Sequence, residues 1–487
     1  MLKGQAEADD MVTSRILKGG AFLALFAGAM GACTTQVGGG SGGATGGSTG
    51  ATGGTTGTSP TATVGSGGAA YPGSGFIVHE WGTDTVVVGS DGSLQRGLHH
   101  EEEDLPSFVY DRIKAGSLSG GASVEVKMET PVTYFYSDHP VSAKVSVGFP
   151  SGVFTQWYPT VQSFWPLIVA PSTIGPTPPL ASFRDPVFDP HYPFGNASCM
   201  AHYGAIAHGS LDWGTVNVLP RSAAAAGPEA PLDKFTWSYA RQVAANDIQV
   251  SGPGAKDPSQ SERFLFYRGL GNFDLPVHAT TSKGGAFSLA NTYAESVATV
   301  IALNVGATSG AFVVHPEGIA AKGTLAGTVP SLDGAPSLDT FVDALAVEVT
   351  KALDGTGLYH DEATAMVNTW KRQWFRTPGT RLLYLVPQSW TEASIPLTIT
   401  PKPDATTRVM MIRVELITPE LEGADVTMAG KLATSSTDAE ARAYFKALGR
   451  FAEPRLRRAL GLLGQPVYGS AFLGEIATVN TNEAAGE

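Results

Sequence analysis

Four residues that can bind zinc lie close together and form the sharpest local cluster of ligand types in the chain. They are His191, Cys199, His202 and His208. Imidazole nitrogens and thiolates are the usual ligands of structural zinc, and such ligands come in pairs two to five residues apart. Cys199 and His202 satisfy this spacing, His202 and His208 nearly do, and His191 does not. The pattern makes zinc a candidate cofactor, and the alternative is a buried thiol among unrelated loop histidines.

His79 and Glu80 invite comparison with zinc proteases. Those enzymes carry two histidines one helical turn apart, and Thr83 stands where the second histidine belongs. The surrounding pattern predicts a strand, in which successive side chains point to opposite faces. We therefore expect His79 and Glu80 to have separate partners, unless a bulge turns both to one side.

Two further groups of histidines and carboxylates have ordinary structural interpretations. His99-His100-Glu-Glu-Glu-Asp104 concentrates ligands for a divalent cation, yet such a run is usually a solvated loop or an exposed helix start. His360, Asp361 and Glu362 stand at the expected start of a helix. Carboxylates there complement the positive end of the helix dipole, so capping is the first interpretation.

Several mechanisms have no local support in the sequence. Outside the Gly/Ser/Thr-rich stretch of residues 33–74 no Gly-x-Ser-x-Gly nucleophile motif occurs, and no phosphate-binding loop or dinucleotide fingerprint precedes a predicted helix. Four aromatic residues, Trp81, Trp157, Tyr158 and Trp165, could stack against carbohydrate if a sandwich exposed them. Strand tryptophans are more often part of the core.

The candidate residues lie in two kinds of predicted structure, a β-rich part and a mixed α+β part. Between Gly75 and about Pro330, short apolar or alternating runs are separated by turn residues, which is typical of antiparallel strands. We expect one or two β-sandwich-like domains there, over residues 75–225 and 226–330. The boundary is expected either in the proline-dense stretch from Pro171 to Pro193 or in the Ala/Gly/Pro-rich stretch from Ala223 to Pro231, and the second is favoured.

From Ser337 onward the apolar residues recur at helical spacing. A first helix should end at Gly355, and a second should begin near Asp361 and bury Trp370 and Trp374. Strands at 381–386 and 409–417 follow, and then a last helix opened by Thr437-Asp-Ala-Glu440, which Pro454 should break or kink. Residues 331–487 therefore form a mixed α+β region, and the fold class expected is mainly β.

The beginning of the chain predicts export. Arg15 and Lys18 precede an apolar stretch from Gly19 to Met30, which is too short to span a bilayer and has the layout of a signal peptide. Residues 1–32 are therefore expected to be removed. Residues 1–10 carry an acidic lead that fits poorly with such a signal, so Met11 is an alternative start.

The string Met30-Gly31-Ala32-Cys33 resembles the lipobox of bacterial lipoproteins, with Met30 in place of the usual leucine. By that resemblance Cys33 is the lipidated residue, and several acyl chains would anchor the protein stably in a membrane. Residues 33–74 continue as a Gly/Ser/Thr-rich linker with nothing to bury. Such a coil would hold the body about 30–40 Å from its anchor.

Charge and cysteine content exclude some classes of protein. The formal net charge is −12, so nucleic acid is not an expected partner. The chain has 2 cysteines, and lipidation of Cys33 leaves Cys199 without a partner, so a disulfide framework is excluded.

Eight strings taken together resemble an exported bacterial family of unknown function, and they span nearly the whole body. They are His79-Glu-Trp-Gly-Thr83, Met128-Glu-Thr-Pro131 with Tyr134-Phe-Tyr136, Trp157-Tyr-Pro159, Leu265-Phe-Tyr-Arg-Gly-Leu-Gly-Asn-Phe273, Glu362-Ala-Thr-Ala-Met-Val-Asn-Thr-Trp370, Thr380-Arg-Leu-Leu-Tyr-Leu-Val-Pro387 and Arg413-Val-Glu-Leu-Ile-Thr-Pro-Glu420. The resemblance implies no activity and assigns no catalytic residue.

Two functional hypotheses follow from these patterns. The first is a binding or structural role at the cell envelope, with carbohydrate or another envelope protein as partner. The second is a metal-dependent hydrolase whose site is assembled from dispersed His, Asp and Glu. Whether the protein is an enzyme stays open at this point. A site where histidines meet carboxylates favours the hydrolase, and an open aromatic groove favours the binding protein.

Overall fold

The computed structural model describes most of the body of the protein. The described residues are 75–101, 105–112, 124–166, 206–222, 227–228, 237–254, 258–464 and 467–476, together with two short strands at Ile168–Val169 (β7) and Tyr203–Gly204 (β8). These residues belong to one compact unit.

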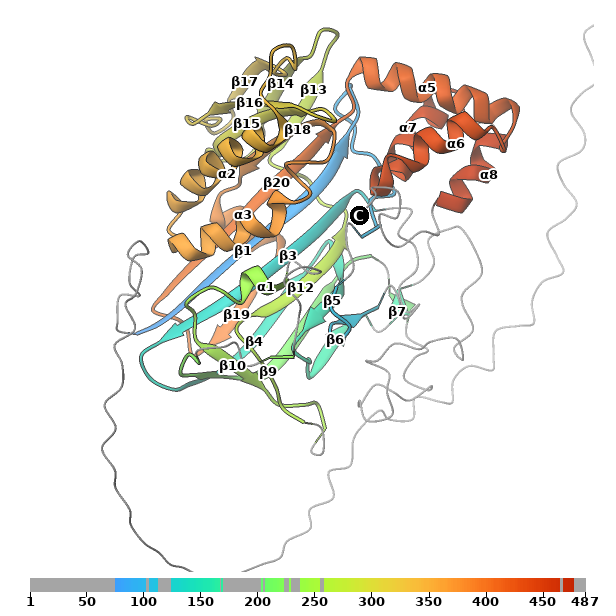
Figure 1. The fold of residues 1–487 in the computed structure, drawn as a ribbon. Coiled ribbons are helices and arrows are strands. Elements are labelled where there is room, and N and C mark those ends of the chain that lie inside the picture. The colour runs from blue at the N-terminus through green and yellow to red at the C-terminus, as the bar shows by residue number, and fades with distance from the viewer. Residues whose placement is uncertain are drawn as a thin grey trace, which may run out of the picture. The chain divides into compact units, whose positions relative to one another are not determined.

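A nine-stranded sheet forms the centre of this unit (Figure 1). In spatial order its strands are β16 (Gly310–His315), β15 (Ala298–Val305), β18 (Gly379–Leu385), β20 (Ala405–Leu416), β1 (Phe76–Val88), β3 (Val126–Ser137), β12 (Leu265–Gly271), β5 (Gly152–Tyr158) and β2 (Tyr110–Asp111). Neighbours are antiparallel except β1 and β20, which run parallel. The predicted mainly β fold with antiparallel sheets is confirmed.

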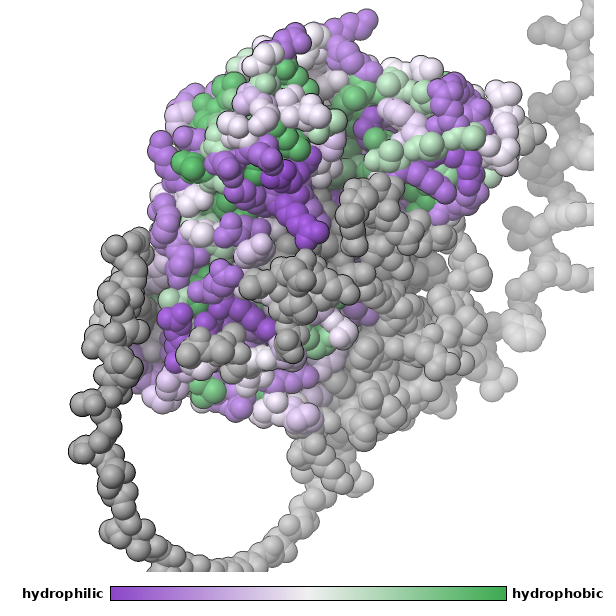
Figure 2. Space-filling view, viewed as in Figure 1, coloured by the Kyte–Doolittle hydropathy of each residue, from purple (hydrophilic) through white to green (hydrophobic). Residues whose placement is uncertain are grey.

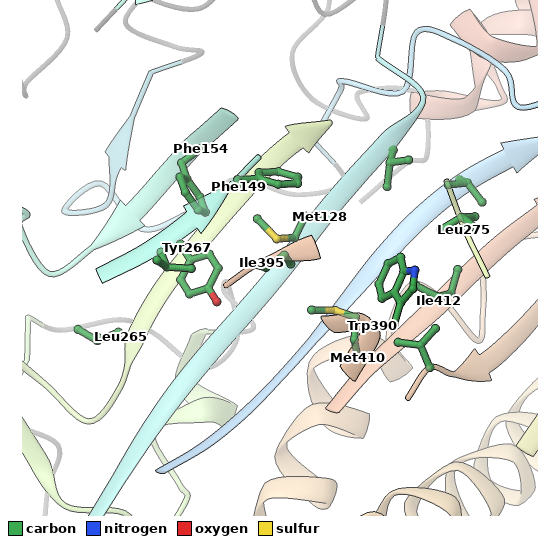
Figure 3. Close-up of a cluster of buried hydrophobic side chains, with 14 of the residues drawn as sticks. Met128, Phe149, Phe154, Leu265, Tyr267, Leu275, Trp390, Ile395, Met410 and Ile412 are labelled. Carbon is green, nitrogen blue, oxygen red and sulfur yellow. The ribbon is translucent and has the colours of Figure 1, made fainter. Parts of the chain in front are cut away.

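A second sheet packs against one face of the first and makes the sandwich. Its strands are β11 (Gln260–Glu262), β10 (Asp247–Val250), β9 (Gly209–Leu219), β4 (Val141–Phe149) and β19 (Leu397–Thr400), with β6 (Ser163–Trp165) also paired to β9. A smaller sheet consists of β13 (Val277–Thr281), β14 (Ala286–Asn291) and β17 (Thr324–Thr328). Figure 3 shows part of the large core that these layers share, in which Met128, Tyr267 and Ile412 come from the central sheet and Phe149 from the second.

Helices cover the other face of the central sheet. They are α1 (Trp237–Ala240), α2 (Leu338–Asp354) and α3 (His360–Lys371). Phe341, Val342 and Leu345 of α2 and Met366 and Trp370 of α3 belong to one buried cluster with side chains of the sheet. Helix α2 ends at Gly355 as predicted, and Trp374 stacks on Trp370 at 4.7 Å between ring centroids.

The chain from residue 419 onward forms a helical group with a small core of its own. It contains α5 (Pro419–Thr434), α6 (Ala439–Lys446), α7 (Ala452–Leu462) and α8 (Val467–Ile476), while a short α4 (Gln388–Ser394) lies earlier beside β20. The expected break near Pro454 is confirmed. Helix α6 ends at Lys446, a 3-10 turn follows at Gly449–Phe451, and Pro454 lies in the first turn of α7, where its missing N–H is tolerated.

The central sheet takes strands from every part of the body. β1 and β3 come from residues 75–225, β12 and β15 from residues 226–330, and β18 and β20 from residues 331–487. The expected boundaries near residues 225 and 330 therefore separate stretches of chain that meet as strands of one sheet. Among the described residues, no helix is both long and apolar enough to cross a membrane.

Candidate functional site

Three potential metal ligands converge where the helical group meets one end of the central sheet. His99 Nε2 lies 2.8 Å from Glu453 Oε2, and His100 Nε2 lies 2.9 Å from the same oxygen. One ligand atom from each of the three residues falls within 4.8 Å of the other two. His100 and Glu453 are buried, whereas the His99 side chain keeps 12% of its surface exposed. Solvent can therefore reach this cluster from the side of His99.

Local backbone features bring the three residues together. The two histidines follow β1 in a loop in which Gly97 has a φ of 101°, and a Cβ there would lie 2.6 Å from Glu453 Cγ. Glycine at 97 thus provides both the left-handed conformation and the room for the glutamate. Glu453 occupies the first turn of α7, where a carboxylate complements the helix dipole.

The surroundings of His100 and Glu453 shift their pKa values in the directions that favour metal binding. Burial lowers the pKa of His100 to about 4, and the charges of His99 and Lys127 add to this effect against the hydrogen bond to Glu453. Burial alone would raise the pKa of Glu453, but hydrogen bonds from His100 and His99 and the charge of Arg457 hold it well below its ordinary value. At neutral pH the cluster offers a neutral imidazole at His100 and a carboxylate at Glu453, which are the forms that bind metals.

The set of two imidazoles and one carboxylate fits zinc. This combination is one of the usual sets of protein ligands in catalytic zinc sites, in which the fourth position is left for water or substrate. Arg457 lies 2.7 Å from Glu453 Oε1, so it orients the carboxylate through the oxygen that the histidines do not share. Ligating carboxylates are commonly held in this way by a second hydrogen-bonding partner.

A network of buried ion pairs surrounds the cluster. Glu101 accepts from Lys127 at 2.7 Å and from Arg268 at 2.8 Å, and Lys127 also approaches the carbonyl of His99 at 3.4 Å. Glu129 pairs with Arg450 at 2.6 Å, immediately before α7. These pairs join β3 and β12 to the loop that carries the histidines. They therefore fix the position of the cluster on the sheet.

Three neighbouring strands are irregular beside this network. The pairing of β1 with β3 shifts between Trp81 and Thr83, and the pairing of β12 shifts at Arg268/Gly269. Thr130 on β3 has a φ of 51°, which a β-branched residue rarely adopts. These residues belong to the strings at 79–83, 128–131 and 265–273 that carry the family resemblance. Bulges and strained residues are over-represented next to functional sites.

His79 and Glu80 have separate partners, as expected for successive strand residues. His79 Nδ1 lies 2.8 Å from Glu362, which also accepts from the Tyr136 hydroxyl at 2.6 Å. Glu80 is held by other residues, because Arg408, Tyr267 and Thr133 donate to its two oxygens at 2.6 to 2.9 Å. Glu80 is therefore a buried structural carboxylate with its hydrogen-bonding capacity filled.

The other residues singled out in the sequence do not form a site within the described part of the chain. Residues 191, 199 and 202 of the predicted zinc cluster lie outside the described residues. His208 lies in an exposed turn with a φ of 58°. His360 contacts Asp354 at 3.1 Å, and Asp361 accepts from the backbone of Ala244.

The four aromatic residues considered for carbohydrate stacking do not share a surface. Trp81, Trp157 and Tyr158 are buried, and Trp165 alone of the four is exposed. A platform of these four residues is therefore wrong, because both faces of the central sheet are covered: Trp157 lies in the core on one face, and Trp81 and Tyr158 lie in the core on the other.

Sequence reasoning singled out His99 and His100 but missed Glu453. No spacing rule connects residues 353 positions apart. The one local signal was an acidic residue beside Pro454, which is typical of the first turn of a helix and says nothing of a ligand. Comparison of the chain with protein-family models and with curated proteins found no match.

Proposed function

We propose that this chain is an exported bacterial lipoprotein, anchored through Cys33, whose body binds a divalent transition-metal ion, zinc above all, through His99, His100 and Glu453. The convergence of these three side chains on one point carries the metal-binding part of the proposal. The signal-like segment, the lipobox-like string before Cys33 and the Gly/Ser/Thr-rich linker support export and anchoring.

The arrangement of elements around the ligands supports a binding and structural role for the metal. The two histidines belong to a loop after β1, and Glu453 belongs to α7. A bound ion would therefore join the helical group to the central sheet. Metal binding would then stabilise the contact between these two parts, because binding to the folded state alone adds to the free energy of unfolding.

Metal content of the purified full-length protein tests the site. We expect about one equivalent of zinc in protein extracted with detergent from cells grown in zinc-replete medium. His100→Asn and Glu453→Gln should each lose the metal, because either change removes one of three ligands. His360→Asn is the matched control, since His360 is an exposed histidine that also contacts a carboxylate. A wild-type protein that purifies without metal and binds none on titration contradicts the proposal.

Cobalt substitution separates this site from the cluster at His191, Cys199, His202 and His208. A cysteine ligand gives a thiolate-to-cobalt charge-transfer band in the near ultraviolet, and two histidines with a glutamate do not. We expect a cobalt spectrum without that band, and retention of zinc by Cys199→Ser. Loss of the metal in Cys199→Ser but not in Glu453→Gln would assign it to the other cluster instead.

Fractionation of cells tests the anchor. Cys33→Ala should move the protein from the membrane fraction to the soluble fraction, because the acyl chains are lost. Its metal content and melting temperature should stay unchanged. Full membrane retention of Cys33→Ala would rule out lipidation as the anchor.

Hydrolysis is the second candidate function, favoured by the three-ligand site. Three protein ligands leave one position of a tetrahedral zinc for water, whose pKa the ion lowers to about 7. The expected result is slow hydrolysis of activated esters by the zinc form that disappears in Glu453→Gln and survives in His360→Asn. Equal rates in the wild type and Glu453→Gln would rule out hydrolysis at this site, and the binding role would remain.

A further inference from the structure

A small, partly open cavity lies beside the irregular segments of β1, β3 and β12, on the face of the sheet that α1 and α3 cover. Figure 1 shows these two helices over the strands. Trp81, Thr130 and Arg268 line it from the three strands, and Thr369 of α3 lines it from the helical side. Its volume is about 10 Å³, which is room for one water molecule or one monatomic ion.

Three buried polar atoms around this cavity have no hydrogen-bond partner among the residues that the structure describes. They are Trp81 Nε1, Thr130 Oγ1 and Arg268 Nε. Their residues are 0%, 8% and 4% exposed, so bulk water does not satisfy them. The Trp81 indole N–H lies close enough to the Tyr134 hydroxyl oxygen to act as a weak donor that offsets part of the rise in the Tyr134 pKa, but it makes no hydrogen bond of normal geometry. The Tyr134 hydroxyl itself donates to the carbonyl of Ala240.

The remaining polar side chains of the cavity wall are already bonded. Trp237 donates to Glu262 at 3.1 Å, and the Thr369 hydroxyl donates to the carbonyl of Ala365 at 2.8 Å. Most of the other lining residues are apolar, among them Val132, Phe264 and Phe266. The unused hydrogen-bonding capacity of the wall is therefore concentrated in three strand residues.

Two of these three groups can only donate. An indole N–H and a guanidinium N–H have no acceptor capacity, and a threonine hydroxyl can donate as well. A water molecule could accept from two of them, but its own two protons would then face a wall with little more than Thr130 Oγ1 to accept them. An anion accepts from all three and donates nothing, so it matches the wall better.

The local charge favours an anion in the same way. Arg268 and Lys127 both pair with the one carboxylate of Glu101. Glu129 is already paired with Arg450. The group of Arg268, Lys127 and Glu101 thus carries one positive charge in excess, in a buried place where an uncompensated charge is costly.

From these observations we propose that the cavity is a binding site for a small monovalent anion, a halide such as chloride, held by Trp81, Thr130 and Arg268. The bulges and the left-handed Thr130 bring these three residues to the wall of one cavity, and a ligand there would account for a strained conformation in the middle of a long strand. This site is distinct from the proposed metal ligands and does not depend on the metal.

Thermal unfolding of the full-length protein in detergent is the first test, with sodium bromide compared against sodium gluconate at equal ionic strength. Bromide should raise the melting temperature by several degrees with saturation, because a ligand bound to the folded state alone stabilises it. Gluconate is too large for the cavity. Equal melting temperatures in the two salts would overturn the proposal and leave water as the occupant.

Two matched tryptophan variants locate the effect. Trp81→Phe keeps an aromatic ring but removes the donor, so it should weaken bromide binding about tenfold or more, as loss of a hydrogen bond to a charged group does. Trp370→Phe removes another buried indole donor that lacks a partner but does not line the cavity, and it should bind bromide as the wild type does. Equal loss in both variants would overturn the assignment to this cavity.

Anomalous scattering from bromide-soaked crystals gives a readout that does not require variants to fold. The expected result is a bromide peak within hydrogen-bond reach of Trp81 Nε1 and Arg268 Nε. A cavity that shows only water at saturating bromide would contradict the proposal even if the melting temperature had shifted.

Discussion

Strand β1 contains two buried carboxyl groups, and the surroundings of Asp84 stabilise a negative charge less than those of Glu80 do. Asp84 is fully buried, and neither oxygen has a hydrogen-bond partner in the described part of the chain. Burial raises its pKa well above the ordinary value, and the charge of Glu129 adds to the rise. The folded protein therefore keeps a proton on Asp84 at a pH where the unfolded chain has released it.

This difference predicts how stability depends on pH. Above the ordinary Asp pKa near 3.9, the folded state binds the extra proton, so Asp84 opposes folding more strongly as pH rises, by about 1.4 kcal/mol per pH unit until its folded pKa is reached. Asp84→Asn is always neutral. Its stability relative to the wild type should therefore increase from pH 5 to pH 7 in urea unfolding.

The exposed Asp333 provides the control for that experiment. Asp333→Asn should follow the wild type at every pH. If the stability of Asp84→Asn relative to the wild type also stayed constant with pH, the pKa of Asp84 would be the same in the folded and the unfolded protein, and the prediction would be wrong.

Neutralising Glu80 should lower stability, in contrast to neutralising Asp84, because the charge of Glu80 is fully partnered. Glu80→Gln leaves the buried Arg408 without its counter-charge, and removing one member of a buried pair typically costs about 3–5 kcal/mol. Denaturant unfolding should show this loss, while the zinc content should stay unchanged. Glu348→Gln, at an exposed pair with Lys351, should change stability by less than about 0.5 kcal/mol. A loss of metal in Glu80→Gln without loss of stability would instead place Glu80 in the functional site.

At the scale of elements, the bulge in β1 depends on a glycine. A Cβ at Gly82 would lie 3.0 Å from Pro131 Cα and 3.1 Å from Pro131 N on the neighbouring strand. These are backbone atoms, which cannot move aside as the end of a flexible side chain can. The close approach of β1 and β3 therefore explains why position 82 is a glycine.

Alanine substitutions at two glycines test this explanation. Gly82→Ala should lower the free energy of unfolding by about 1–3 kcal/mol, the usual cost of overpacking. Gly423→Ala should raise it by up to about 1 kcal/mol, because Gly423 is an exposed residue of α5 with nothing within 4 Å of an added Cβ. Calorimetric melting of both variants measures the difference. A neutral Gly82→Ala would mean that β1 and β3 can separate at the bulge without cost.

At the scale of the whole molecule, the central pairing joins distant parts of the chain. β1 and β20 run side by side, and Glu80 bonds to Arg408 across 328 positions of sequence. On the described surface, hydrophilic and hydrophobic residues are interspersed (Figure 2).

The composition of the linker predicts that it contributes little to stability. Deleting Val37 to Ser66 removes Gly, Ser, Thr and Ala residues that have nothing to bury, so the melting temperature should change by no more than about 1 °C. Calorimetry of the deletion variant beside the full-length protein measures this. A drop of several degrees would show that the linker packs on the body.

The sequence alone determined much of the local structure, because periodicity and caps act over a few residues. It predicted strands over the first part of the body, a helix ending at Gly355, the second helix with its buried Trp370, and the break near Pro454. It also predicted that His79 and Glu80 would have different partners, since that follows from strand alternation alone. Helix α5 was missed.

Tertiary structure decided which strands pair and which residues meet. The partnership of β1 with β20 and the meeting of His99 and His100 with Glu453 depend on contacts between segments hundreds of residues apart. No local pattern encodes such contacts, because they arise when the whole chain buries its apolar surface. The cavity lined by Trp81, Thr130 and Arg268 has the same origin. Trp81 stood out in the sequence only as an aromatic residue, and no local pattern marked Thr130 or Arg268 as part of a site. The alignment of three irregular strands brought all three to one cavity wall.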